Sequence, residues 1–409
     1  VVVVGGMGSI PGAYLAALLI AEVKAVCIWL GLVDVFGVAV SFSKLTLVVD
    51  FLVMAIVLVW RPWGLLGKPQ APSRYVGLRE EPLRAASPVY VWAAALLGVV
   101  LVAMPWLTPN SPYTTVLMID LLIAALFATS LHFIMGPAGM HSFGHAAYFG
   151  VAGYALAFFT PAGEPISLWW SLPAAVGVSA LLALIIGFLV VRTHGIYFIM
   201  VTMAFSQMVF YAFFDNKALG GSDGVYINFK PEAMLFDLEN KTTFYFFTLA
   251  MMLVVYLFLR RLLWSPFGRA LSGIRVNEHR MRALGFGTFG HKLAAFTLAG
   301  ALAGLAGYLW GAQSGYVNPE LLGFHMSAHV IMMVILGGMG NFAGAIVGAF
   351  SFEYLLHLFK DLPQVAGFNL GKHWQLWMGL FIVALVILAP RGILGLLASL
   401  LKSKESGHD

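Results

Sequence analysis

Long apolar runs recur along most of the chain, each about 20 residues in length, and they restrict the environment in which it can fold. Hydrophobic residues make up 61% of the sequence and charged residues 10%. A soluble domain is typically about half hydrophobic and about a quarter charged. So much apolar surface requires lipid around it. The runs lie at 10–32, 45–60, 88–106, 113–135, 145–160, 168–191, 196–214, 244–263, 292–311, 325–338, 341–358 and 374–390.

The length and uniformity of these runs match membrane-spanning helices and not the shorter alternating strands of a membrane β-barrel. The predicted fold class is therefore all-α, a polytopic transmembrane helical bundle with broken helices. We expect the lipid bilayer to contact its outer surface.

The distribution of arginine predicts how the bundle is oriented. If the polar linker 61–87 lies in the cytoplasm, alternation of the runs places Arg192, the segment 264–292 and Arg391 on the same side. Basic residues concentrate on the cytoplasmic side of membrane proteins. The net charge of +5 then reflects orientation, and no nucleic-acid partner is expected. The loops predicted to face outward carry lysine but no arginine; they are 107–112, 161–167, 215–243, 312–324 and 359–373.

A basic polar segment, Trp264–Lys292, separates two of the apolar runs. Glu278 lies three residues after Arg275 and four before Arg282, so a helix through the segment would place all three on one face. A short cytoplasmic helix with basic and apolar residues is suited to bind a partner protein.

Two residues of this segment are suited to start and to end such a helix. Asn277 can cap its start, and Gly285 can take the left-handed conformation that ends a helix. An ordinary, positively charged loop is the alternative interpretation. The candidate docking residues are Arg269, Arg275, Glu278, Arg282, Ala283 and Gly285.

Two glycine-rich stretches, Gly136–His145 and Gly337–Gly340, interrupt the apolar runs. Irregular backbone at membrane depth is tolerated only where protein or a water-filled cavity covers it, and broken helices often line transport pathways. A tight cytoplasmic turn is the alternative for each stretch. The pathway is favoured for the first stretch, and both interpretations stay open for the second. The candidate pathway residues are Asp120, Ser142, Phe143, Gly144 and His145.

Acidic residues within the runs are few and scattered. Asp120 and Glu353 lie inside apolar runs, where a carboxylate must face protein or water. Both can instead have a structural hydrogen-bonding role. An ion-coupled carrier needs a connected series of such groups, so the sequence argues against that class.

The sequence offers no catalytic or metal-binding constellation. His141 and His145 share a helix face by spacing, but neither an intervening glutamate nor a nearby third ligand accompanies them. The single cysteine, Cys27, excludes a multi-cysteine metal site. Neither a phosphate-binding P-loop motif nor a nucleophile elbow occurs. We therefore expect no enzyme activity, no bound metal and no cofactor in this chain.

An internal repeat divides the sequence. Val4–Gly12 matches Leu336–Gly344, and Arg61–Gly67 matches Pro390–Gly395. Each pair of matching segments encloses two apolar runs, and tandem modules are common in transporters. The predicted organisation is the C-terminal part of one transport module with two helices at 1–67, a cytoplasmic linker at 68–87, a complete module at 88–395 and a cytoplasmic tail at 396–409.

Several of these motifs together carry a family resemblance. Ala138–Gly150 is similar to the signature AGQLSLGHAAFFG, and Ser265–Leu271 with Lys292–Phe296 resembles the family's cytoplasmic coupling segment. Gly337–Gly340 and Pro390–Gly392 complete the set. The sequence resembles the inner-membrane permeases of branched-chain amino acid ABC importers.

The resemblance extends over most of the chain. Residues 88–395 resemble the LivM-type subunit, and residues 1–67 resemble the end of the LivH-type partner, as expected for part of a fused permease. It implies a bacterial inner-membrane protein without catalytic function. The implied partners are a second permease module, a periplasmic amino-acid-binding protein, and cytoplasmic subunits that dock on the basic segment and bind the ATP.

The sequence departs from the family signature at two positions. Met140 replaces glutamine and His141 replaces leucine, which leaves the substrate open. Import of urea or short amides by the same family is therefore the alternative function. An ion-coupled secondary carrier is the alternative from a different class.

Overall fold

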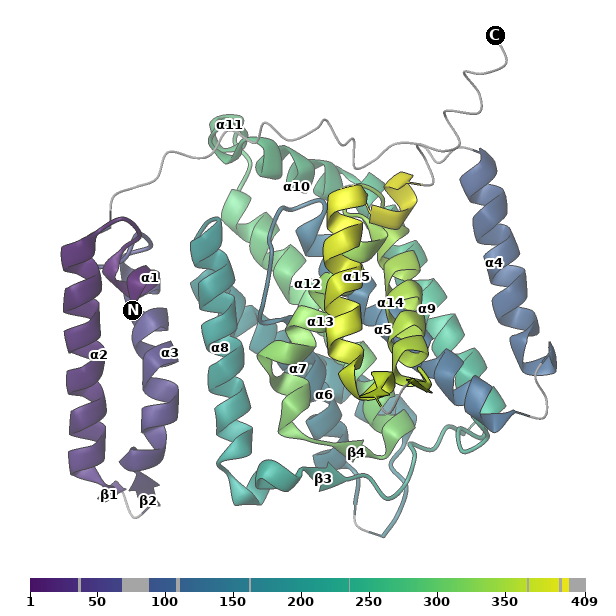
Figure 1. The fold of residues 1–409 in the computed structure, drawn as a ribbon, viewed down its shortest axis with the longest axis horizontal. Helices are drawn as coiled ribbons and strands as arrows, with labels where there is room; N and C mark the ends of the chain where they lie inside the picture. Colours follow the sequence, from purple (N-terminus) through teal and green to yellow (C-terminus); the bar gives the residue numbers. More distant parts are fainter. Residues whose placement is uncertain are drawn as a thin grey trace.

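A computed structural model describes residues 1–35, 38–67, 88–107, 111–161, 163–234, 236–365, 368–389 and 392–396. In these residues the chain is a bundle of helices with three small two-stranded sheets (Figure 1). The predicted all-α class is thus confirmed. The predicted linker 68–87 and most of the predicted tail, 397–409, lie outside the described residues.

The long helices follow the predicted apolar runs within a few residues, because uninterrupted apolar sequence satisfies its backbone internally as helix. The polar segment forms two further helices, α10 and α11. The helices are α1 (Val2–Gly5), α2 (Ile10–Leu30), α3 (Phe42–Trp60), α4 (Pro88–Leu107), α5 (Pro112–Met135), α6 (His145–Phe159), α7 (Leu168–Val190), α8 (Ile196–Phe214), α9 (Lys241–Trp264), α10 (Pro266–Val276), α11 (Glu278–Ala283), α12 (Thr288–Ser314), α13 (Phe324–Gly337), α14 (Gly344–Lys360) and α15 (Trp374–Leu388).

The remaining elements are short and lie in loops. They are β1 (Leu32–Val35), β2 (Val38–Ser41), β3 (Val225–Tyr226), β4 (Tyr316–Val317), β5 (Gln364–Val365), β6 (Phe368–Asn369), and the 3-10 helices η1 (Lys217–Leu219), η2 (Gly221–Asp223), η3 (Pro319–Leu322) and η4 (Leu370–His373). β1 pairs with β2 and β5 with β6 as antiparallel hairpins, whereas β3 pairs with the distant β4.

Seven of the described helical spans are long and apolar enough to cross a membrane. Helices α6 and α13, with 15 and 14 residues, are shorter. At 1.5 Å per residue they extend only about 21–23 Å, less than the roughly 30 Å of hydrocarbon. Their lengths match the prediction of broken helices.

Helix α12 is the centre of the bundle and packs on α5, α6 and α7. A Cβ added at Gly300 would lie 2.3 Å from Cβ of Ala183, and one at Gly304 would lie 2.5 Å from Cβ of Ser179. Only glycine permits this approach, so Gly300 and Gly304 form a small-residue seam that allows close helix packing.

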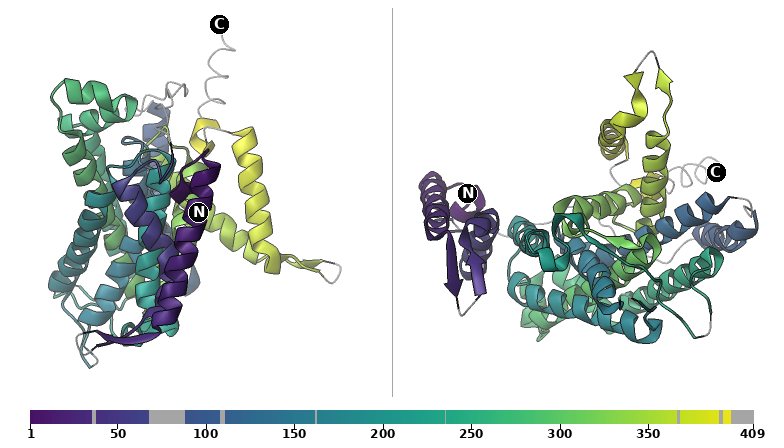
Figure 2. Two further views of the ribbon diagram at one scale, coloured as in Figure 1. Left: turned by 90° about the vertical axis from the view of Figure 1, so that its left-hand side faces the viewer. Right: turned by 90° about the horizontal axis from the view of Figure 1, so that it is seen from below.

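Helices α1–α3 form a small unit beside α8 (Figures 1 and 2). The rings of Phe51 and Tyr211 are 6.3 Å apart, and Lys44 donates a hydrogen bond to the Asp215 carbonyl. Within the unit, Lys24 of α2 forms an ion pair with Asp50 of α3 at 2.7 Å.

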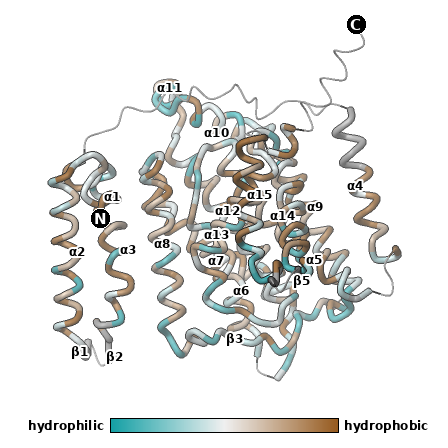
Figure 3. Tube along the Cα trace, viewed as in Figure 1, coloured by the Kyte–Doolittle hydropathy of each residue, from teal (hydrophilic) through white to brown (hydrophobic). Residues whose placement is uncertain are grey.

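The two ends of the bundle differ in their elements. Figure 1 shows α10 and α11 at one end, and the strands β1–β4 at the other. Figure 3 shows that α11 is hydrophilic, while apolar residues dominate the helices between the ends. The polar ends and the apolar middle agree with a multi-pass membrane protein.

Candidate functional site

The first glycine-rich stretch is an irregular segment that joins α5 to α6 inside the protein. Helix α5 ends at Met135, and α6 begins only at His145. Ser142 and His145 have no exposed surface, and Gly144 is so close to α8 that an added Cβ would lie 2.3 Å from the Thr202 carbonyl oxygen. Residues 136–144, named the first break below, are therefore enclosed by protein. This is the covering that irregular backbone requires at membrane depth.

Polar groups of the first break are satisfied by side chains from other helices. The Phe143 amide donates to Thr202 Oγ1 of α8 at 3.1 Å, and the following Ala146 amide donates to Ser327 Oγ of α13 at 3.0 Å. These bonds replace the partners that the first amides of a helix lack. The position of the break therefore depends on α8 and α13.

His145 connects the break to α5. Its Nε2 lies 2.9 Å from Ser130 Oγ, and its ring stacks on Phe127 at 5.5 Å between centroids. These contacts give the buried His145 a structural role that requires no metal. In the described part of the chain, moreover, no three histidine, cysteine or acidic side chains are grouped to hold a metal ion.

Of the predicted pathway residues in the break, Phe143 is the one that keeps an accessible side chain. It is half-buried and stacks on Phe324, the first residue of α13, at 5.6 Å between ring centroids. Together with the Ala146–Ser327 bond, this contact brings the N-termini of α6 and α13 together. Nothing in the residues themselves indicated that α13 would begin beside the first break.

Asp120 lies apart from this group. It is on α5, ten residues before Ser130, which is about 15 Å along the helix axis. Its carboxylate is instead within electrostatic range of Glu353 on α14. The fold thus brings the two carboxylates that the sequence singled out into the same region, and Asp120 lies away from the first break.

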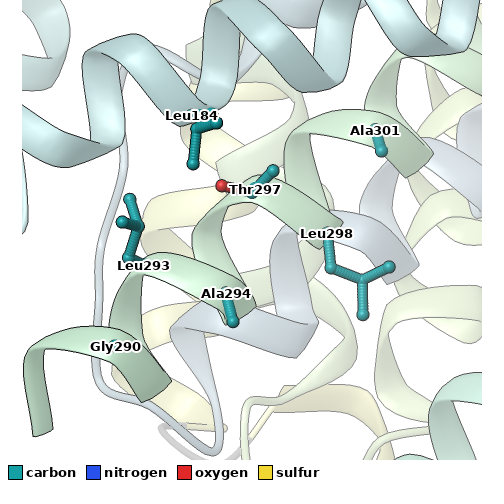
Figure 4. Close-up of a pocket in the computed structure, with 7 residues that line it drawn as sticks. All are labelled: Leu184, Gly290, Leu293, Ala294, Thr297, Leu298 and Ala301. Carbon is teal, nitrogen blue, oxygen red and sulfur yellow. The ribbon is translucent and has the colours of Figure 1, made fainter. Parts of the chain in front are cut away.

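An open groove lies away from the first break. Its volume is about 490 Å³, and it is formed between Leu184 of α7 and the first four turns of α12 (Figure 4). Almost all of its wall is apolar. The pathway role of the first break remains a prediction.

The second glycine-rich stretch is a tight turn between two helices. The Gly338 amide bonds back to Val334 and Ile335 of α13, and the Gly344 amide bonds to the Asn341 carbonyl. A Cβ at Gly337 would lie 1.8 Å from the Gly344 carbonyl oxygen. Residues 338–343 are named the second turn below. They have the geometry of a tight turn, which is one of the two interpretations that the sequence left open.

The N-terminal unit repeats this turn in atomic detail. Gly6 has φ 102° and ψ 122°, and Gly338 has φ 99° and ψ 124°. A Cβ at Gly64 would lie 2.5 Å from the Gly6 nitrogen, and one at Gly392 would lie 2.5 Å from the Gly338 nitrogen. The left-handed region favours glycine. Helix, hairpin and helix follow in both copies, so the sequence repeat is a structural repeat.

The basic segment forms two helices instead of the single helix expected. Asn277 has the extended conformation φ −157°, ψ 98°, which ends α10. Its side chain then accepts from the Arg280 amide and caps α11, as predicted. Gly285, with φ +88°, follows the end of α11 as predicted.

Glu278 is the centre of an ionic cluster. Its carboxylate contacts Arg282 and Lys292, and its Oε2 lies 2.9 Å from His194 Nε2. Thr288 adds a hydrogen bond to the same carboxylate at 3.1 Å. Burial opposes its ionisation, but the hydrogen bonds from His194 and Lys292 outweigh burial and hold the pKa of Glu278 well below its usual range.

This cluster fixes α11 against α12 and against the end of α7. His194 and Thr288 were not predicted, because the segment from residue 191 to 195 is distant in sequence and threonine carries no distinctive signal. Arg269, Ala283 and Gly285 are exposed, as a docking surface requires.

Arg275 does not share the face of Glu278, contrary to the spacing prediction. The chain turns at Asn277, so the one-helix geometry on which the prediction rested is absent. The half-buried Arg275 side chain instead donates from Nη1 to the Gly136 carbonyl oxygen at 2.6 Å.

Comparison with known proteins agrees with this architecture. A family model described as the permease component of the branched-chain amino acid transport system matches residues 113–390. The chain belongs to this family. It is accordingly a membrane-spanning transport permease, which confirms the recognition made from the sequence motifs.

Curated relatives give the same assignment. The chain is 29% identical over 336 residues to the high-affinity branched-chain amino acid permease LivM of Salmonella typhimurium, with 76% of each chain covered. It is 28% identical to LivM of Escherichia coli, also over 336 residues and with 76% of each chain covered. The LivH permease of Escherichia coli is 28% identical over 156 residues, which is 36% of this chain and 45% of LivH. No solved structure matches the chain significantly.

Proposed function

We propose that this chain is a permease subunit of an ATP-driven importer for branched-chain, hydrophobic amino acids in the bacterial inner membrane. It forms part of the translocation pathway and carries no catalytic site. Separate cytoplasmic subunits bind the ATP, and a periplasmic amino-acid-binding protein delivers the substrate. The observation that carries the proposal is the family match over most of the chain, together with two LivM relatives.

The proposed pathway passes the place where α6 and α13 begin. The Phe143–Phe324 pair is half-buried and apolar, as expected for contact with a hydrophobic side chain. Helix N-termini carry partial positive charge, which favours the carboxylate of an amino acid. Pathway candidates Ser142, Gly144 and His145 support this place from inside the protein and do not face the substrate.

The proposed ATPase-docking surface is the exposed side of α10 and α11. Val276 is 83% exposed, Leu284 64% and Phe286 42%, although all three are apolar. Arg269, Arg280 and Arg282 of the same two helices are also exposed. Apolar side chains within a basic border are suited to enter a groove on a partner protein. The ionic cluster at Glu278 keeps this surface rigid.

The modules are proposed to follow the structural repeat. Residues 1–67 correspond to the end of a LivH-type permease, 68–87 to a cytoplasmic linker, 88–395 to the LivM-type permease and 396–409 to a tail. The repeated glycine geometry at Gly6 and Gly338 supports this division.

Reconstitution of the whole transporter tests the proposed function. Proteoliposomes with this permease, its second permease module and the ATPase subunits should accumulate labelled leucine only with ATP and the binding protein. Accumulation driven by a proton gradient without ATP would contradict the proposal. Labelled urea and acetamide in parallel vesicles decide between the amino-acid importer and the amide importer.

Met140 bears on this choice of substrate. It stands where the family signature has glutamine, yet it is only 6% exposed and its amide bonds to the Ile134 carbonyl in the last turn of α5. The substitution therefore alters internal packing, and we expect leucine to be retained as substrate.

A further inference from the structure

One side chain joins the cytoplasmic helices to the first break. Arg275 of α10 donates from Nη1 to the Gly136 carbonyl oxygen at 2.6 Å. Gly136 directly follows the last residue of α5, and its own amide bonds to the His132 carbonyl. A cation at the C-terminal end of a helix is electrostatically favourable, and a charged donor gives a strong hydrogen bond.

The backbone of the break is shaped around the same side chain. Gly139 has φ +68°, and a Cβ added there would lie 3.0 Å from Cγ of Arg275. A side chain at position 139 would therefore be strained by its φ and would press on the arginine stem. Two points of the break, three residues apart, thus contact one arginine.

The far end of the break is connected to other helices. From Gly139 the chain reaches Phe143 within four residues, and there Thr202 of α8 accepts its amide. A short segment therefore connects α10 to the N-termini of α6 and α13. Helix α11 follows α10 directly in the chain, so a force applied to α11 also acts on α10.

We infer that Arg275 is a positioning residue that transmits movement of the cytoplasmic helices α10 and α11 to the first break. Its role is inside the protein, in contrast to the exposed arginines of the docking surface. The inference rests on the proposed function, because the contact between Arg275 and Gly136 can transmit movement only if an ATPase subunit moves α10.

The contact itself is tested on the permease chain alone in detergent. Hydrogen–deuterium exchange of amides in 136–144 should become about tenfold faster in Arg275→Met, as expected for loss of a hydrogen bond to a charged donor. Arg275→Lys retains a cationic donor and should restore part of the protection. Arg261→Met removes an exposed arginine at the end of α9 and should leave exchange unchanged. Unaltered exchange in Arg275→Met would disprove the tie.

The transmission is tested in the complete transporter by the ratio of leucine taken up to ATP hydrolysed. Arg275→Met should assemble with the ATPase subunits and hydrolyse ATP, while uptake per ATP falls several-fold and Arg275→Lys recovers part of it. Faster exchange with an unchanged ratio would overturn the transmission role. If the unaltered transporter shows no ATP-dependent uptake, the proposed function fails and the transmission role with it, while the exchange result still decides the contact.

Discussion

The first break and the second turn are both glycine-rich interruptions of apolar sequence, but they satisfy their backbones in opposite ways. The second turn bonds only to the two helices that it connects, through Gly338 to the end of α13 and through Asn341 to Gly344 at the start of α14, among the hydrogen bonds described for it. The first break also bonds outward, to Thr202 of α8 and Arg275 of α10, and the first turn of α6 that follows it bonds to Ser327 of α13. Composition alone does not separate these two outcomes.

The difference predicts separate mechanical roles for the two interruptions. A turn that closes on its own backbone acts as a fixed joint, and the structure uses the same joint again at Gly6. A segment whose hydrogen-bond partners belong to other helices must move when those helices move. The first break is therefore the interruption suited to a transport cycle, and substitutions in the two places should have different consequences.

The largest effect is expected at the second turn. In Gly337→Ala the new Cβ would lie 1.8 Å from the Gly344 carbonyl oxygen, and backbone cannot retreat there without separating α13 from α14. We expect little folded protein, measured as monodisperse material after detergent extraction from membranes.

Gly177→Ala is the matched control for this substitution, because nothing lies within 4 Å of its added Cβ on helix α7. Equal yields of the two variants would show that the second turn is not a fixed joint. Gly5→Ala tests the repeated turn, since its Cβ would lie 2.3 Å from the Gly12 carbonyl carbon.

A smaller effect on stability is expected at the first break. Gly144→Ala would place a Cβ 2.3 Å from the Thr202 carbonyl oxygen, and such overpacking costs about 1–3 kcal/mol. Because the break can shift, the protein should fold with a lowered Tm and a large loss of leucine uptake. Thermal unfolding and proteoliposome uptake measure the two effects. A variant with lowered Tm and normal uptake would argue against the first break as the moving part.

The outward hydrogen bonds are tested by Thr202→Val, which removes the acceptor of the Phe143 amide while keeping the side-chain shape. An unsatisfied buried amide costs about 1–3 kcal/mol. Thr129→Val is the matched control, because that buried hydroxyl bonds to the Ala125 carbonyl of its own helix. Chemical or thermal denaturation should show the larger loss for Thr202→Val, and equal losses would remove the contrast between the two interruptions.

The smallest effect concerns pH and the cluster that holds α11. Hydrogen bonds from His194 and Lys292 lower the folded-state pKa of Glu278 despite opposition from burial. The stabilisation is therefore present above the unfolded-state pKa of about 4.3 and is lost as pH falls toward the folded-state value. Hydrogen exchange of α11, corrected for intrinsic rates, should not loosen between pH 7 and 5 but should loosen below about pH 4.

Glu278→Gln provides the control for the pH experiment. It removes the charge, so α11 should exchange faster at pH 7 and should show no further loosening on acidification. Loosening of α11 in the unaltered protein between pH 7 and 5 would contradict the assigned role of Glu278. The second turn should show no change in either case.

The sequence by itself determined the membrane environment, the helix positions and the internal repeat. These properties depend on local composition: about 20 apolar residues must form a helix in lipid, and repeated glycines reproduce the same backbone angles wherever they occur. The sequence predicted the cap at Asn277 and the helix end near Gly285 for the same reason, because capping involves only residues a few positions apart.

Only the tertiary structure decided which side chains meet across the bundle. The spacing of Arg275, Glu278 and Arg282 predicted one face, but the extended backbone at Asn277 separates the first from the other two. Arg275 then reaches Gly136, 139 residues away, and Glu278 reaches His194, 84 residues away. Such contacts depend on the packing of helices that are distant in sequence, and local sequence patterns do not predict that packing.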